Sequence, residues 1–259
     1  MSDYEAFELF KKNVYKKTGI NLDQYKEKQM KRRLTTLMNK RGFSSYNEYW
    51  KHLLQDSNMY REFLDRITIN VSEFFRNPQR WEVLENHILP QLIKNKPEGL
   101  KVWSAACSTG EEPYSLAMVL SNYYSLDKVK ILATDLDEQV LQKAREGLYS
   151  QERIKETSKH YLNKYFKVEG TLYRVDENIK RCVTFQKHNL LKDNFDKGFD
   201  LILCRNVMIY FTEDAKKTLY KKFYDALTYG GVLFVGSTEQ IFDAGKLGFK
   251  SIATFFYQK

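Results

Sequence analysis

The chain has 259 residues, enough for one large domain or a large and a small one, and 42% of them are hydrophobic. No apolar run is long enough to span a membrane and the N-terminus does not resemble a signal peptide, so we expect a cytoplasmic protein without a membrane-inserted segment. The net charge of +9 predicts an acidic partner: nucleic acid, an anionic membrane surface or an acidic protein. The cysteines and histidines lack the spacing of metal ligands, so no metal is expected; the cysteines number three, which argues against disulfides.

Residues 1 to about 75 lack proline and repeat apolar residues near every 3.6 positions, which predicts an all-helical segment. The range Lys26 to Arg41 contains seven basic residues and a single acidic residue, Glu27. On a helix, Met30, Leu34, Leu37 and Met38 would share one face, and Lys28, Lys31 and Arg32 would lie opposite. This basic face is either an ordinary solvated surface or a docking surface for an acidic partner.

The helical segment ends in I-T-I-N-V-S-E-F-F-R-N-P, residues 67–78, because Pro78 disfavours helix at Asn77. Asn70, Ser72 and Arg76 alternate there with apolar residues. They form either a helix end with a surface arginine or a domain junction that presents polar groups to a cleft. Residues 79–95 then read as a linker helix.

The central stretch of the chain is V-W-S-A-A-C-S-T-G-E-E-P-Y, residues 102–114. Residues 100–106 predict a strand, and the apolar spacing after residue 114 predicts a helix. We expect Thr109 to cap this helix, with Glu112 completing a capping box. Strand, small-residue turn and helix together are typical of the first unit of a nucleotide-binding fold.

A second strand, residues 129–134, ends in Asp135, where folds of this kind bind ribose hydroxyls. Asp135 could instead cap the following helix, which is expected to end at Gly147. The motif G-x-G-x-x-G is absent, so a phosphate cradle is not expected. A nucleoside without a pyrophosphate fits better, and S-adenosylmethionine is the common ligand of that kind.

Residues 148–180 interrupt the alternation of strands and helices, and Gly170 with the following L-Y-R-V predicts a short hairpin in a small insertion. Further strands are expected at residues 182–187, 199–204 and 232–235, a helix at about 213–227, and two edge strands between 249 and 257. This alternation predicts a parallel sheet, with ligands beyond the carboxyl ends of its strands. The groups expected at that edge are Ala106–Gly110, Asp135, Asn189–Leu190 and Asn206–Val207.

Four motifs make the sequence recognisable: R-I-T-I-N-V-S-E-F-F-R, V-W-S-A-A-C-S-T-G-E-E-P-Y-S-L-A-M, A-T-D-L-D and C-R-N-V-M-I-Y-F. Together they resemble the CheR family of chemotaxis receptor protein-glutamate O-methyltransferases, over nearly the whole chain. The resemblance implies an α/β fold with a class I (Rossmann-like) methyltransferase sheet, preceded by an all-helical N-terminal domain and carrying an inserted antiparallel β-subdomain. The implied division is a helical domain at 1–76, a linker helix at 77–99 and a methyltransferase domain at 100–259, with the insertion at about 148–180.

The resemblance also implies site residues. Contacts to S-adenosylmethionine, which would leave as S-adenosylhomocysteine, map onto Asn70, Ser72, Arg76, Ala106, Glu112, Asp135, Asn189, Leu190, Asn206 and Val207. Arg76 would orient a carboxylate and Tyr210 would line the same pocket, although a tyrosine there is as often a core residue. Lys28, Lys31 and Arg32 would dock the cytoplasmic helical domain of methyl-accepting chemotaxis receptors. We expect a monomer that binds no nucleic acid.

Two other functions fit parts of the sequence. A nucleic-acid methyltransferase would suit the basic charge, but methylases of base amino groups typically carry Asn/Asp-Pro-Pro-aromatic where this chain has Asn206-Val207-Met208-Ile209. A non-catalytic sensor of S-adenosylmethionine could keep the same fold, but Arg76, Asp135 and Asn206 are all present.

Overall fold

A computed structural model describes residues 3–68, 72–94 and 96–259. The chain divides into two compact units. The first comprises Met1–Asn70 together with Tyr210–Lys217, and the second comprises Val71–Ile209 together with Thr218–Lys259. The chain therefore returns to its N-terminal unit after it has built most of the second.

The first unit is helical, as predicted, because its apolar side chains recur at helical spacing. Its helices are α1 (Asp3–Thr18), the short 3-10 helix η1 (Leu22–Gln24), α2 (Glu27–Lys40), α3 (Tyr46–Leu53) and α4 (Ser57–Thr68). Aromatic rings from α1, α3 and α4 fill the core between them: Phe7, Phe10, Tyr46, Tyr49 and Phe63.

Helix α2 buries the predicted face, since Met30, Leu34, Leu37 and Met38 are all at most 4% exposed. Lys28 and Arg32 are exposed, as expected of an outer face. Lys31 differs from the prediction, because it is half-buried and its Nζ lies 5.3 Å from the centre of the Phe7 ring. The reason is its position at the border of the apolar face, where a long side chain lies over a neighbouring ring.

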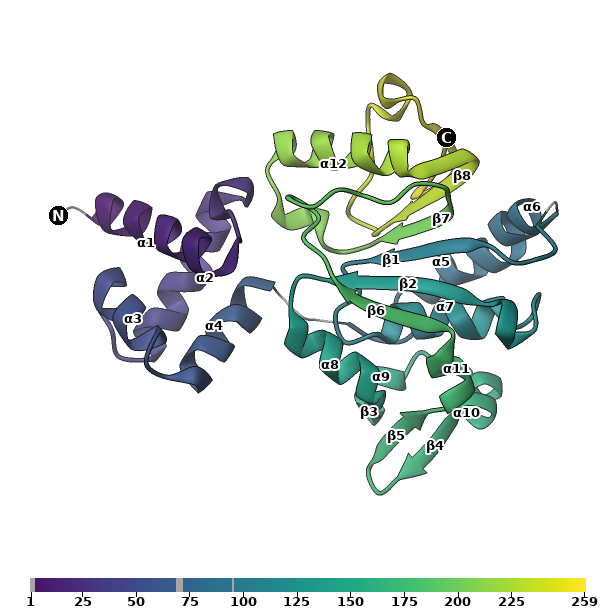
Figure 1. Ribbon diagram of the computed structural model, residues 1–259, viewed down its shortest axis with the longest axis horizontal. Helices are drawn as coiled ribbons and strands as arrows, with labels where there is room; N and C mark the ends of the chain where they lie inside the picture. The colour runs from purple at the N-terminus through teal and green to yellow at the C-terminus, as the bar shows by residue number, and fades with distance from the viewer. Residues whose placement is uncertain (1–2, 69–71, 95) are drawn as a thin grey trace. The chain divides into compact units, whose positions relative to one another are not determined.

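The second unit is built on a seven-stranded sheet within the described residues, in the order β6-β2-β1-β7-β8-β10-β9 (Figure 1). The strands are β1 (Lys101–Ala105), β2 (Lys130–Asp135), β6 (Val183–Lys187), β7 (Phe199–Cys204), β8 (Leu227–Val235), β9 (Lys250–Ala253) and β10 (Phe256–Gln258). Strands β6 to β8 in this order are parallel, and β10 pairs antiparallel with both β8 and β9. The prediction of two edge strands at the C-terminus was therefore wrong for β10, which lies inside the sheet.

The helices of this unit are α5 (Pro78–Val83), the π-helix η2 (Leu84–Ile88), α6 (Leu89–Ile93), α7 (Glu111–Leu120), η3 (Leu126–Lys128), α8 (Glu138–Glu146), η4 (Met208–Tyr210), α12 (Glu213–Ala226) and η5 (Ala244–Leu247). Helices η4 and α12 run across the border of the two units. Helix α8 ends at Gly147, as predicted.

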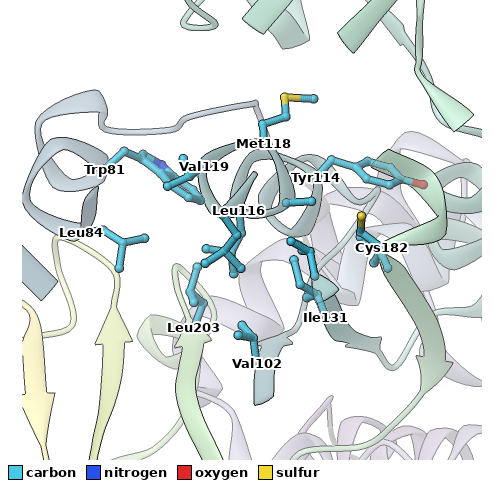
Figure 2. Close-up of a cluster of buried hydrophobic side chains, with 14 of the residues drawn as sticks. Trp81, Leu84, Val102, Tyr114, Leu116, Met118, Val119, Ile131, Cys182 and Leu203 are labelled. Atoms are coloured by element: carbon cyan, nitrogen blue, oxygen red, sulfur yellow. The ribbon is translucent and has the colours of Figure 1, made fainter. Parts of the chain in front are cut away.

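One face of the sheet packs against α5, η2 and α7. Figure 2 shows Leu116 and Val119 of α7 above Val102, Ile131 and Leu203 of the strands, and all five are at most 1% exposed. Burial of each such side chain stabilises the fold by about 1.5–3 kcal/mol. On the other face, the Trp103 ring contacts the rings of Phe199 and Phe223. Phe223 lies in the part of α12 that belongs to the second unit. Both faces of β1 are thus covered, which fixes its carboxyl end in place.

The predicted insertion is a separate three-stranded antiparallel sheet in the order β3-β5-β4 (Figure 1). Its strands are β3 (Leu148–Ser150), β4 (Phe166–Glu169) and β5 (Leu172–Val175). The helices of the same segment are α9 (Gln151–Ile154), α10 (Lys159–Tyr165) and α11 (Glu177–Arg181). Strands β4 and β5 form the hairpin expected around Gly170. In the described part of the chain, no helix is both long and apolar enough to cross a membrane.

Candidate functional site

The candidate site lies where four parallel strands of the second unit end. Strands β6, β2, β1 and β7 are consecutive neighbours in the sheet, so their carboxyl ends share one edge. The loops beyond them are tied together by hydrogen bonds. The Cys107 N–H donates to the carbonyl of Thr134 (2.9 Å), and the His188 N–H donates to the carbonyl of Asp135 (2.9 Å). Convergence of these loops was the central prediction from the sequence.

The loop after β1 has an unusual backbone. Ala106 (φ 61°), Ser108 (φ 50°) and Gly110 (φ 93°) all adopt the left-handed region, which non-glycine residues rarely enter. A side chain at position 110 would also place its Cβ only 2.8 Å from the Cβ of Ala144 in α8. Glycine is therefore needed here both for its conformation and for the close approach of α8.

The predicted capping box at α7 was wrong. The residue before the helix is Gly110, and the Thr109 hydroxyl instead donates to the carboxylate of Glu111 (2.7 Å to Oε2). Glu112 accepts a hydrogen bond from the Ser104 hydroxyl (2.8 Å). Gly110 occupies the N-cap position in a left-handed conformation, and the Thr109 hydroxyl binds a side chain of the first helical turn.

Asp135 is a buried carboxylate that joins two of the loops. Its Oδ2 accepts the Ser108 N–H (2.8 Å) and its Oδ1 accepts the Asp137 N–H (3.0 Å). Burial raises its pKa to about 6, against the effect of these hydrogen bonds. The alternative of a helix cap does not hold, because Asp137 caps α8 by accepting the Gln139 N–H (2.9 Å).

The loop after β6 contains Asn189 and Leu190. The Asn189 side-chain oxygen accepts the Leu191 N–H (3.0 Å), and the backbone N–H of Asn189 donates to the Asp193 carboxylate (2.8 Å). Leu190 is 7% exposed, and its carbonyl accepts a hydrogen bond from the Lys222 ammonium (3.0 Å). These contacts order the loop next to Asp135.

A buried arginine connects three parts of the site. Arg205, directly after β7, places Nη1 3.3 Å from the Glu112 carboxylate and donates from Nη2 to the carbonyl of Arg76 (2.7 Å). The Trp81 indole N–H donates to the same carbonyl (3.1 Å). Two donors thus fix the backbone of Arg76 at its carbonyl.

The surroundings of Arg205 are largely apolar. Its side chain is 3% exposed, and its guanidinium carbon lies 4.6 Å from the centre of the Phe234 ring. Burial lowers its pKa, and burial raises the pKa of Glu112, whereas each charge partly restores the ionised form of the other. Within the described residues, the Arg205 Nε has no hydrogen-bond partner. Such a buried pair is costly to break on one side only.

The segment before α5 holds the remaining predicted contacts. Asn70 lies outside the described residues. The carbonyl of Ser72 accepts a hydrogen bond from Arg153 Nη1, and the Phe74 N–H donates to the carbonyl of Arg153 (2.9 Å). Burial raises the pKa of Glu111, while contacts from Thr109, Arg153 and Ser72 lower it. Ser72 is therefore placed at the start of α7, beside the loop after β1.

Asn206 follows Arg205 in the loop after β7 and has a left-handed backbone (φ 61°). Its N–H donates to the carboxylate of Glu239 (2.7 Å). Val207, which follows, is half-buried. The second unit thus brings together Ser72, Arg76, Ala106, Glu112, Asp135, Asn189, Leu190, Asn206 and Val207.

Tyr210 belongs to the first unit. Its carbonyl accepts the N–H of Lys26 (2.9 Å), and the Thr212 N–H donates to the carbonyl of Gln24 (2.9 Å). The Arg33 guanidinium carbon, on α2, lies 5.3 Å from the centre of the Tyr210 ring. Tyr210 is therefore joined to the helix that carries the basic face, and its pairing with Arg76 at one site stays a prediction.

Sequence reasoning assigned no role to Arg205, Arg33 or Glu239, and it included Ser108 only within the expected range Ala106–Gly110. A signal existed for Arg205, since an arginine that directly continues a buried apolar strand needs a buried acid. No comparable local signal marks Glu239, because two of its three backbone partners, Asn206 and Ile209, lie 33 and 30 residues earlier.

This edge suits a ligand with hydroxyl groups. The Asp135 carboxylate can accept further hydrogen bonds, since each oxygen has two lone pairs. Within the described residues, the Ser108 Oγ is buried and has no hydrogen-bond partner, and its N–H is bound to Asp135. The Asp135 carboxylate and the Ser108 hydroxyl suit the hydroxyl groups of a ribose better than a metal ion. The described residues contain no group of three His, Cys, Asp or Glu that could hold a metal ion.

Comparison with known proteins agrees with this geometry. Residues 5–68 match the family model described as CheR methyltransferase, all-alpha domain, and residues 70–255 match CheR methyltransferase, SAM binding domain. A chemotaxis protein methyltransferase of Listeria monocytogenes is 43% identical, over 96% of this chain and 95% of the relative. Proteins of the same name in Borreliella burgdorferi and Escherichia coli are 39% identical (89% and 86% covered) and 34% identical (87% and 81% covered). The chain therefore belongs to the CheR family of chemotaxis protein methyltransferases and uses S-adenosylmethionine as its cofactor.

Proposed function

We propose that this methyltransferase esterifies glutamate side chains of methyl-accepting chemotaxis receptors and so serves sensory adaptation. The observation that carries the proposal is that two hydrogen bonds fix the backbone of Arg76. Arg205 and Trp81 both bind its carbonyl, and Arg205 pairs with Glu112 at the strand edge. These contacts fix the backbone of Arg76, a cation, close to the Arg205–Glu112 pair.

The cofactor supplies a methyl group that is already activated by a sulfonium. A glutamate side chain has an ordinary pKa of about 4.3, so it is ionised at neutral pH and can attack without a general base. The protein needs chiefly to orient the carboxylate and to exclude water from it. No nucleophilic triad is required for that task.

We assign roles to the chain's residues accordingly. Arg76 orients a carboxylate, of the substrate or of the cofactor, by paired N–H bonds. Tyr210 lines the substrate position. The cofactor contacts are Asn70, Ser72, Arg76, Ala106, Glu112, Asp135, Asn189, Leu190, Asn206 and Val207, with Asp135 accepting from the ribose hydroxyls. We also propose that the chain divides into a helical domain at 1–76, a linker helix at 77–99 and a methyltransferase domain at 100–259.

The partner is the cytoplasmic helical domain of the receptors, which the enzyme meets as a cytoplasmic monomer. Lys28 and Arg32 are exposed on α2 and would attract an acidic helical surface. Complementary charge of this kind raises the association rate and weakens with salt. Lys31 contributes less freely, because its ammonium lies over the Phe7 ring.

The test is transfer of labelled methyl from S-adenosylmethionine to receptor-containing membranes and, in parallel, to nucleic acid. The proposal predicts label on the receptors that mild alkali removes, because carboxyl methyl esters hydrolyse in base and N-methyl groups do not. Alkali-stable label on nucleic acid would overturn the substrate, and cofactor binding without any transfer would point to a sensor.

A further inference from the structure

Glu239 lies beyond the carboxyl end of β8 and none of the assignments above uses it. It is 4% exposed. Its Oε2 accepts the N–H groups of Asn206 (2.7 Å) and Gly236 (2.7 Å), and its Oε1 accepts the N–H of Ile209 (3.2 Å). One buried carboxylate therefore binds both ends of the segment 206–209.

The segment that Glu239 binds is the loop after β7. Cys204 and Val235 are the last paired residues of the neighbouring strands β7 and β8, so the two loops start side by side. Asn206 takes a left-handed conformation, which asparagine tolerates better than most residues but which still persists best where neighbouring contacts hold it. The hydrogen bond from its N–H to Glu239 is such a contact.

Gly236 shows how closely the parts fit. A Cβ at this position would lie 2.4 Å from the Glu239 Oε2 and 2.7 Å from the Asn206 nitrogen. Its φ is not in the left-handed region, so the glycine is required by space and not by conformation. Any side chain there would push the carboxylate off the Asn206 N–H.

We propose that Glu239 is a positioning residue for cofactor binding, which acts by holding the segment 206–209 in its binding conformation. The inference rests on the proposed assignment of Asn206 and Val207 as cofactor contacts. Burial raises the pKa of Glu239, while hydrogen bonds from the backbone of Asn206, Gly236, Ile209 and Met208 lower it. All of these partners are donors, so the site needs a side chain with acceptors only.

Glu239→Gln tests this requirement at constant shape. A glutamine has one acceptor oxygen and one NH₂ group, so at least one of the three N–H groups would face a donor. We expect the dissociation constant of S-adenosylhomocysteine, measured by calorimetry on folded protein, to rise about tenfold or more, since bonds to charged acceptors are the stronger ones. The KM for S-adenosylmethionine should rise likewise, with the KM for receptor unchanged.

Asp200→Asn is the matched control. Asp200 is also buried (5% exposed) and accepts a backbone N–H, that of Lys101 (2.9 Å), but it lies at the start of β7, opposite the site. Both variants should lower the melting temperature, whereas only Glu239→Gln should weaken ligand binding. Wild-type affinity in Glu239→Gln, or equal weakening in Asp200→Asn, would overturn the proposal.

Gly236→Ala gives a second, independent test, because it displaces the carboxylate without removing it. We expect it to weaken S-adenosylhomocysteine binding as Glu239→Gln does, and unchanged affinity would contradict the close fit. The readout is cofactor affinity alone. If the wild type binds S-adenosylhomocysteine but methylates no receptor, the proposed substrate fails while this inference is still tested.

Discussion

The Nη2 of Arg205 donates a 2.7 Å hydrogen bond to the carbonyl of Arg76, a residue 129 positions earlier in the chain. The same guanidinium faces the Glu112 carboxylate at 3.3 Å. One side chain thus joins the loop after β7, the first turn of α7 and the segment before α5. The network explains how the site residues of the second unit come from segments far apart in sequence.

Replacement of Arg205 by Met should destabilise the fold strongly, because it keeps the apolar contacts and leaves Glu112 without its cation. We expect the free energy of unfolding to fall by about 3 kcal/mol, the lower end for a broken buried pair, since Glu112 can take up a proton. Arg145→Met breaks an exposed pair with Glu138 and should cost less than about 1 kcal/mol. Urea denaturation of both variants measures the difference, and equal losses would contradict the buried network.

Arg76→Ala should abolish most activity without unfolding the protein. The bonds from Arg205 and Trp81 go to the Arg76 carbonyl, which the substitution retains. We expect methyl transfer to fall at least about 100-fold, as for other removed charge-stabilising donors. Arg76→Lys should be intermediate, since it keeps the charge but not the paired N–H geometry. Near-normal turnover of Arg76→Ala would refute the role of Arg76.

Asp135 should make cofactor binding pH-dependent. Its pKa is raised to about 6, and protonation removes acceptor capacity for ribose hydroxyls. The affinity for S-adenosylhomocysteine should be full above about pH 7 and fall by up to about tenfold per unit below about pH 6. Calorimetry across this range should show a flatter dependence for Asp135→Asn, and an unchanged slope would assign the titration to another group.

The stability of the unliganded protein should respond to Asp135 with the opposite sign. A raised pKa favours the protonated carboxyl in the fold, so this group stabilises below its ordinary pKa of 3.8. That contribution is lost as the pH rises through about 6. Thermal unfolding of Asp135→Asn and wild type at several pH values measures it.

Charge reversal on α2 should affect the partner and not the cofactor. Lys28→Glu with Arg32→Glu replaces two exposed charges, so we expect the KM for receptor to rise and its salt dependence to weaken. Lys94→Glu with Lys130→Glu makes the same change of net charge at exposed positions of the second unit, the latter at the start of β2, and serves as the control. An equal rise in the KM for receptor in the two double variants would contradict a docking role for Lys28 and Arg32.

Local patterns predicted the strands and helices well. The run F-D-L-I-L-C gave β7 with its observed bounds, because an apolar stretch of that length between turn residues is typical of a buried strand. The all-helical N-terminus, the inserted hairpin and the end of α8 at Gly147 were likewise predicted. Each of these depends on spacing within a few residues.

Features that depend on distant contacts were not predicted. The capping box at Thr109 failed because Gly110 takes a left-handed conformation against Ala144. Lys31 was placed on the outer face, although the ring of Phe7 from another helix partly covers it. The bonds of Glu239 to Asn206 join residues 33 apart. No window of sequence contains both partners of such a contact.

The central claim is that the acceptor is a glutamate carboxylate, and mass spectrometry of receptor peptides tests it most directly. Receptor would be incubated with S-adenosylmethionine and either wild type or Arg76→Ala, and the modified residues mapped. We expect one added methyl on glutamate side chains with the wild type and almost none with Arg76→Ala. Methyl groups on lysine, arginine or histidine, or modification that persists at the wild-type level in Arg76→Ala, would contradict it.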